Sequence, residues 1–372
     1  MQDFSPLPGP QSYQAVSSSI SSGRRSFGRG LIAAASAVLV ALILIEALHK
    51  GGATDLGFEN WRPVLLAFVA WSVALGIGQV VIRGDAGERA LFILPAALFV
   101  VAIVIFPTLF GLYIAFTDWN LSSFTGQHFN GIDNLVALFH DAYFWNALVN
   151  MVYYVLAVLI EYAIAFGLAL LLSAEIRARK FFRVVFLLPF MLSPVAVSWM
   201  VGKSMMEYRY GPMATLMRHL GWQSPSFFTD PWIARISIEA MDAWVSIPFI
   251  MILLLAGLQA LPKEVIEASR IDGATGWQQF REITFPLMLP VSITAVVLRI
   301  IFKLKLADIV INTTSGGPGG ATDTVSSFIY REYRDRSNVG YGTMLAMFYL
   351  VIIIIVVTTL LKLAGRFVRQ VT

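Results

Sequence analysis

Three ionisable residues lie within long stretches of the sequence that are otherwise almost entirely apolar. Arg299 and Lys303 are four residues apart, so in a helix they share one face. Glu161 stands in the middle of another apolar stretch, where a short carboxylate cannot reach the membrane surface. Ionisable groups inside a membrane are costly and are by default candidates for a functional site. These residue types indicate either ion pairing, with Arg299 or Lys303 as a partner of Glu161, or recognition of a polar substrate.

A polar segment, EASRIDGATGWQQFREITFPLMLP at 267–290, separates two apolar stretches. Val265, Ala268 and Ile271 recur every third residue, which predicts a short helix with one apolar face. Gly273 can end this helix by adopting a left-handed conformation. The segment therefore predicts a helix and a turn that lie at the membrane surface.

A second short helix is expected after the turn, with Trp277, Phe280 and Ile283 on one side. Pro286 and Pro290 then open the next membrane helix, because proline is tolerated in a first turn. Such a segment either rests on lipid as an amphipathic helix or docks another protein. The mixture of both charge signs favours a protein partner, since faces that bind lipid prefer Lys and Arg.

The elements that position these residues are membrane helices. The chain of 372 residues is 57% hydrophobic and only 13% charged, and its mean hydropathy is +0.72. A soluble domain of this length does not need so much apolar surface, whereas a bilayer core requires about 20 apolar residues per helix. Eight stretches qualify: 31–49, 63–82, 90–117, 147–173, 184–202, 243–262, 286–311 and 341–361.

Basic residues predict the orientation of these helices. With both termini in the cytoplasm, the cytoplasmic segments hold fifteen Lys and Arg and the opposite segments eight. Residues 1–28 are rich in Ser, Gly and Pro and are expected to form a disordered tail. The first apolar stretch is longer than a usual signal-peptide core, which favours a retained helix over a cleaved signal. Four prolines predict kinked helices: Pro107, Pro189, Pro194 and Pro248.

Several function classes find no support in the residues. The chain has no cysteine, and its histidines show no ligand spacing. A phosphate-binding GxxxxGK[ST] sequence is absent, so ATP hydrolysis is not expected in this chain. A membrane enzyme would need acid, base or metal groups clustered at one membrane face. An ion-coupled secondary transporter often has two related halves, and none are visible here.

The polar segment resembles the EAA loop of permease subunits of binding-protein-dependent ABC importers, in the carbohydrate branch. The branch pattern EAAxIDGAxxWQxFxxITLP is similar to EASRIDGATGWQQFREITFP, with Ser269 and Phe285 as departures. Three other segments resemble the same branch in the same order, namely 129–154, 177–200 and 313–347. The resemblance covers about 90–370.

This resemblance implies an all-α membrane protein of about eight transmembrane helices. A six-helix ABC-importer permease body would occupy 84–372, with the cytoplasmic EAA coupling loop at about 263–290. Two additional transmembrane helices would occupy 29–83, after the tail at 1–28.

The implied function is that of a pore subunit without enzymatic activity, which moves a sugar, polyol or related carbohydrate into the cytoplasm. The implied partners are a second permease, two copies of a cytoplasmic ATPase, an extracytoplasmic substrate-binding protein and membrane lipid, but no nucleic acid. ATP and Mg are expected on the ATPase, and no cofactor or metal in this chain. The implied location is the bacterial cytoplasmic (inner) membrane, with multiple passes and both termini cytoplasmic.

The resemblance also implies two groups of site residues. ATPase coupling is assigned to Glu267, Ala268, Ser269, Arg270, Asp272, Gly273 and Arg281, with Glu267 pairing with a basic residue of the ATPase. The resemblance places the substrate path near Asp242, Ser246, Arg299, Lys303 and Leu306. Three further candidates follow from residue type and depth, namely Glu161 and the tryptophans Trp199 and Trp244, which either stack on a sugar or pack in the bundle. Charged members of the second group either pair with one another or recognise an anionic substrate such as an acidic sugar or glycerol phosphate.

Overall fold

The computed structural model describes residues 21–371 apart from 51–53, 59 and 175–176. Regular secondary structure in the described residues is helical, as predicted. Seven of these helices are long and apolar enough to cross a bilayer, and a bent pair of shorter helices brings the number to eight. The chain divides into two compact units, Met1–Phe110 and Gly111–Thr372.

The first unit contains α1 (Ser22–Lys50), α2 (Arg62–Arg83) and α3 (Asp85–Val100). Helices α1 and α2 form a hairpin, in which the indole Nε1 of Trp71 donates a 2.9 Å hydrogen bond to the Ser36 hydroxyl. Helix α1 begins at Ser22, so residues 22–28, which were predicted to belong to the disordered tail, are helical. The rest of that tail lies outside the described residues.

The division between the units differs from the predicted boundary after residue 83. Helix α3 packs against α2 and belongs to the first unit. A π-helical turn, Val101–Ile105, connects α3 to α4 (Phe106–Ala115), and the division falls within α4.

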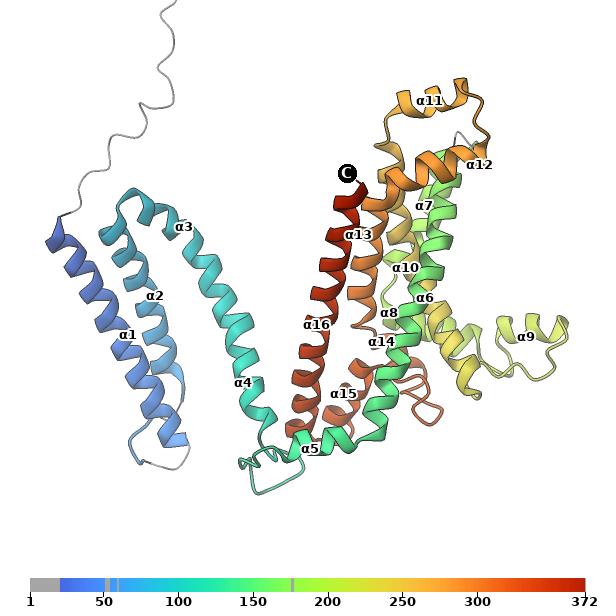
Figure 1. The fold of residues 1–372 in the computed structure, drawn as a ribbon. Coiled ribbons are helices and arrows are strands. Elements are labelled where there is room, and N and C mark those ends of the chain that lie inside the picture. Colours follow the sequence, from blue (N-terminus) through green and yellow to red (C-terminus); the bar gives the residue numbers. More distant parts are fainter. Residues whose placement is uncertain (1–20, 51–53, 59, 175–176, 372) are drawn as a thin grey trace, which may run out of the picture. The chain divides into compact units, whose positions relative to one another are not determined.

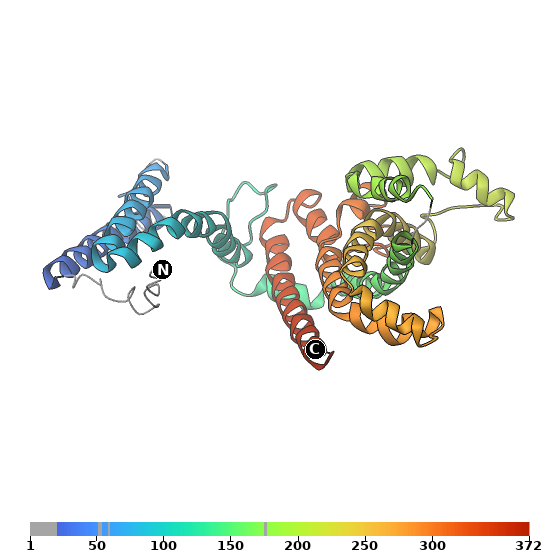
Figure 2. The same ribbon diagram turned by 90° about the horizontal axis from the view of Figure 1, so that it is seen from above.

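The second unit is built on three long helices. These are α6 (Ala142–Ser173), α10 (Pro231–Gln259) and the span that ends in α13 (Phe285–Lys303). They enclose a core that includes Ala165, Met251 and Ala295. Helix α13 lies between α10 and α16 (Val339–Val371) and contacts both (Figure 2).

Short polar residues begin the two longest internal spans of this unit. Asp141 accepts hydrogen bonds from the backbone N–H groups of Tyr143 and Phe144 at the start of α6. Asp230 does the same at the start of α10, where it accepts from Trp232 and Ile233 at 2.9 Å. Capping satisfies N–H groups that have no partner within the helix, and typically contributes about 1 kcal/mol.

The stretch predicted as one helix over 184–202 is broken. Its two parts, Arg179–Met191 and Pro194–Met205, meet at an angle of 93°. They comprise α7 (Arg179–Leu187) with a 3₁₀ turn, and α8 (Pro194–Val197) with a π-helical segment. Pro194 explains the break, because the residue before a proline avoids the helical conformation, and Ser193 is extended with ψ 145°.

Two other predicted spans have different bounds. The span predicted at 243–262 begins earlier, at Pro231. The span predicted at 286–311 ends at Lys303, and the short helix α14 (Asp308–Thr313) follows a turn.

Short helices lie at opposite ends of the second unit (Figure 1). At one end, α11 (Lys263–Ile271) and α12 (Gly276–Gln279) project beyond the membrane helices, and the carboxyl-terminal end of α16 lies at this end too. At the other end lie α5 (Asp133–His140) and α15 (Val325–Arg334), and α9 (Pro212–His219) projects from the side of the unit.

Candidate functional site

Four of the charged residues singled out in the sequence meet at one buried cluster. Arg299 on α13 donates from Nε to Glu161 of α6 at 2.5 Å and from Nη2 to Glu161 at 3.0 Å. Its Nη2 also donates to Asp242 of α10. Lys303, one turn further along α13, donates from Nζ to Glu161 at 2.9 Å and to Asp242 at 2.5 Å. The expectation that Glu161 pairs with Arg299 or Lys303 is therefore confirmed, with both.

A fifth member of the cluster, Glu239, was missed from the sequence. Its Oε2 accepts a hydrogen bond of 2.6 Å from the Lys303 ammonium. Glu239 lies three residues before Asp242 on α10, so both face the same side of the helix. Both residues precede the membrane helix predicted at 243–262, so their three-residue spacing was the only signal that the sequence offered.

The geometry of the cluster indicates that both cations are paired within it. Three carboxylates surround two cations, and the side chains of Lys303 and Arg299 are 0% and 5% exposed. The ammonium of Lys303 bonds one oxygen from each carboxylate, so it occupies the position that a metal ion would need. Pairing offsets the large desolvation cost of each charge. Neither cation is exposed enough to meet an anionic substrate.

The remaining substrate-path candidates lie elsewhere. Leu306 is buried in an apolar cluster with Ile309 and Val310. Trp244 lines an apolar groove of about 870 Å³ between α7 and α10, and 42% of its surface is exposed. Trp199 is exposed outside that groove, and Ser246 is half-buried on α10. The structure thus joins the charged candidates through their side chains, and the other candidates take no part in those ion pairs.

Helix α11 presents nearly all of its residues to the exterior. Only Ile266 and Ser269 are turned inward, and the other seven of its nine residues are exposed. Gly273 follows the helix with φ +77°, the left-handed conformation expected from the sequence. Six of the residues assigned to coupling are exposed: Glu267, Ala268, Arg270, Asp272, Gly273 and Arg281.

Ser269, the seventh residue assigned to coupling, is 5% exposed. Its side chain faces the inner side of α11, so it is not available to a partner on the outer side. The assignment of Ser269 to ATPase coupling stays a prediction, and any part that its side chain plays is played from the inner side of the helix.

Two large apolar side chains are also exposed on the segment formed by α11 and α12. Ile271 is 86% exposed and Trp277 is 68% exposed. The predicted second helix does not stand alone, because α12 continues through a π-helical turn, Phe280–Thr284, into α13. An exposed face with apolar and charged groups of both signs suits a protein partner.

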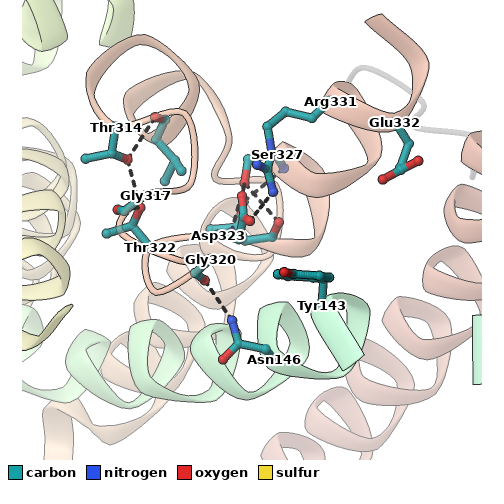
Figure 3. Close-up of polar contacts among 12 residues, drawn as sticks. Tyr143, Asn146, Thr314, Gly317, Gly320, Thr322, Asp323, Ser327, Arg331 and Glu332 are labelled. Carbon is teal, nitrogen blue, oxygen red and sulfur yellow. Dashed lines mark hydrogen bonds and ion pairs between the residues drawn. The ribbon is translucent and has the colours of Figure 1, made fainter. Parts of the chain in front are cut away.

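A glycine-rich loop at 314–324 is held against α6 at the opposite end of the unit (Figure 3). Asn146 and Asn150, one turn apart on α6, donate to the carbonyl of Gly320 at 2.7 and 3.0 Å. Arg235 of α10 donates to the carbonyl of Ala321 at 2.8 Å. These side chains satisfy loop carbonyls that have no helical partner.

Asp323 anchors the carboxyl-terminal end of this loop. Its buried carboxylate accepts a hydrogen bond of 3.1 Å from the Ser327 hydroxyl and pairs with Arg331 (Figure 3). A Cβ on Gly316 would lie 2.1 Å from the same carboxylate, so only glycine fits there. Burial raises the pKa of Asp323 to about 6 despite the nearby guanidinium of Arg331.

The raised pKa of Asp323 predicts a pH dependence of stability. Because the folded value of about 6 exceeds the ordinary value of 3.8, the stabilising contribution is complete below about pH 3.8 and is lost as pH rises through 6. Relative to Asp323→Asn, the wild type should lose on the order of 1 kcal/mol between pH 5 and pH 7.5. Melting temperatures of both proteins in detergent across this range test it, and parallel curves would contradict it.

Comparison with known proteins places these features in a family. Residues 162–370 match the family described as "Binding-protein-dependent transport system inner membrane component". The chain is similar to the trehalose/maltose transport system permease protein MalF of Thermococcus litoralis, with 31% identity over 75% of this chain and 94% of the relative. It is also similar to the sulfoquinovosyl glycerol transport system permease protein SmoG of Agrobacterium fabrum, with 31% identity over 71% of this chain and 86% of the relative.

The fold is similar to a solved structure as well. A chain of the bacterial ABC transporter involved in the import of the acidic polysaccharide alginate matches with a TM-score of 0.65 and 23% identity. The match covers 75% of this chain and 95% of that chain. It supports the arrangement of helices described above.

Proposed function

Because the chain belongs to the inner-membrane components of binding-protein-dependent transport systems, we propose that it forms half of the pore of an ATP-driven importer for carbohydrates. The observation that carries this proposal is the projecting helix α11, with an exposed outer face beside the membrane helices. Two relatives that this chain matches over most of their length are named as carbohydrate permeases, which supports the class of substrate. An ion-coupled carrier has no ATPase subunit, so it does not need a docking segment of this kind.

The same proposal assigns partners to the two ends of the second unit. A cytoplasmic ATPase, which carries ATP and Mg, docks on α11 and the start of α12. The carboxyl-terminal end of α16 lies at the same end and is then cytoplasmic. A second permease completes the pore, and an extracytoplasmic binding protein delivers substrate at the opposite end. A solved relative of this fold in complex with a substrate-bound periplasmic protein supports the last assignment.

The buried charge cluster favours a neutral carbohydrate over an anionic substrate. Arg299 and Lys303 already have carboxylate partners, and an anion would have to displace them. The less buried members of the cluster are the acids Glu239 and Asp242, with side chains 19% and 11% exposed. Carboxylates accept hydrogen bonds from sugar hydroxyls and repel anions.

ATPase activity of the reconstituted complex tests the proposal. The complex with its second permease and ATPase is placed in lipid and exposed to binding protein loaded with neutral or acidic sugars. We expect one neutral sugar or polyol to stimulate ATP hydrolysis and to accumulate inside vesicles. Uptake driven by an ion gradient without ATP would overturn the proposal, and stimulation by acidic sugars alone would overturn the preference for neutral substrates.

A further inference from the structure

Side chains on the inner side of α11 contact α12 through Ser269 and Gln279. The family's sequence pattern specifies neither residue, since it has Ala at the first position and any residue at the second. The amide Nε2 of Gln279 on α12 donates to the Ser269 hydroxyl at 3.2 Å and to the carbonyl of Ile266 at 3.3 Å. The Ser269 hydroxyl in turn donates to the same carbonyl at 2.8 Å. Three polar groups on two helices therefore form one closed hydrogen-bonded set.

This set joins the only two residues of α11 that are turned inward. Ile266 is half-buried and Ser269 is buried, whereas the remaining residues of the helix are exposed. Gln279 reaches both of them from α12. The backbone connection between the helices runs through the turn at 272–275, where Gly273 adopts a left-handed conformation. Backbone hydrogen bonds close this turn, from Gly273 to Arg270 at 3.2 Å and from Ala274 to Ser269 at 3.0 Å. The Gln279 contact adds a direct side-chain link between the two helices and so helps to fix the angle between them.

Helix α12 leads directly into the membrane. Residues Gly276–Lys303 form one continuous helical span, which includes a π-helical turn at Phe280–Thr284. The far end of that span carries Arg299 and Lys303 into the buried charge cluster. A displacement of α11 that is transmitted to α12 therefore reaches the cations of the cluster through a single helix.

We propose that Ser269 and Gln279 are positioning residues, which fix α11 to the span Gly276–Lys303 so that movement of a docked ATPase is transmitted to the pore. This inference rests on the proposed function. Without the contact, α11 would still dock but would turn about Gly273, and ATP hydrolysis would continue with less transport. Neither side chain needs to touch the ATPase for this role.

The test measures ATP hydrolysed per molecule transported in proteoliposomes, together with the amount of ATPase that copurifies. Ser269→Ala and Gln279→Ala should each raise this ratio roughly three- to tenfold, the scale expected for one or two lost hydrogen bonds. The double variant should be no worse than either single one, because both act through the same contact. Copurification should stay as in the wild type.

Gln223→Ala is the control for the loss of a glutamine amide, because Gln223 is exposed in the loop between α9 and α10, away from α11 and α12. Its effect on the ratio should be smaller than that of Gln279→Ala. Ratios at the wild-type level in both single variants, or strictly multiplicative effects in the double variant, would overturn the inference while ATP-driven uptake by the wild type still stands. Failure of the wild type to couple ATP to uptake would instead overturn the proposed function.

Discussion

Replacing Glu267 by alanine should lower ATP-driven uptake at least tenfold while the fold stays intact. Glu267 lies on the exposed outer face of α11, and its side chain has no hydrogen bond or ion pair to any other described residue. Its removal should therefore change the free energy of unfolding by no more than about 0.5 kcal/mol. If it pairs with a basic residue of the ATPase in a buried contact, its loss costs about 2–5 kcal/mol of docking free energy.

The charge-reversed variant Glu267→Arg should reduce copurification of the ATPase still further, because two like charges would then face each other. Glu282→Ala provides the matched control, since Glu282 is also exposed at this end of the unit and is not assigned to coupling. Uptake, copurification and thermal stability are measured on the same preparations. Normal uptake by Glu267→Arg would contradict the assignment of α11 as the segment that docks the ATPase.

Replacing Lys303 by methionine should destabilise the protein by about 3–5 kcal/mol. The ammonium of Lys303 is fully buried and bonds Glu161, Glu239 and Asp242 at once. Without it, three carboxylates share the single cation of Arg299, and their mutual repulsion in a medium of low dielectric constant is strong. Denaturation in detergent or the yield of folded protein reports this loss.

Two further variants separate charge balance from packing. Lys305→Met, on an exposed residue two positions later, should leave stability nearly unchanged. Adding Glu239→Gln to Lys303→Met should recover part of the lost stability, because it removes one of the three carboxylates that then share the cation of Arg299. An equal loss from Lys305→Met, or no recovery in the double variant, would contradict the neutralisation of the cluster by Lys303.

Properties that depend on local sequence were predicted well. The length of apolar stretches identified the membrane helices, and Gly273 identified the end of α11, because both follow from residues that are neighbours in the chain. The stretch at 184–202 was predicted as one helix and is two, although Pro189 and Pro194 indicated a kink. Proline predicts that a helix is interrupted, whereas the angle of 93° depends on what the two parts pack against.

The sequence by itself determined which side chains bear charge within the membrane and which segment projects from it. Only the tertiary structure decided their partners. Arg299 and Glu161 are 138 residues apart, and their pairing depends on how α6, α10 and α13 pack rather than on any local pattern. The contact between Ser269 and Gln279 likewise depends on how α11 and α12 lie against each other. Helical periodicity shows which residues share a face, but the neighbour that each face meets is set by long-range packing.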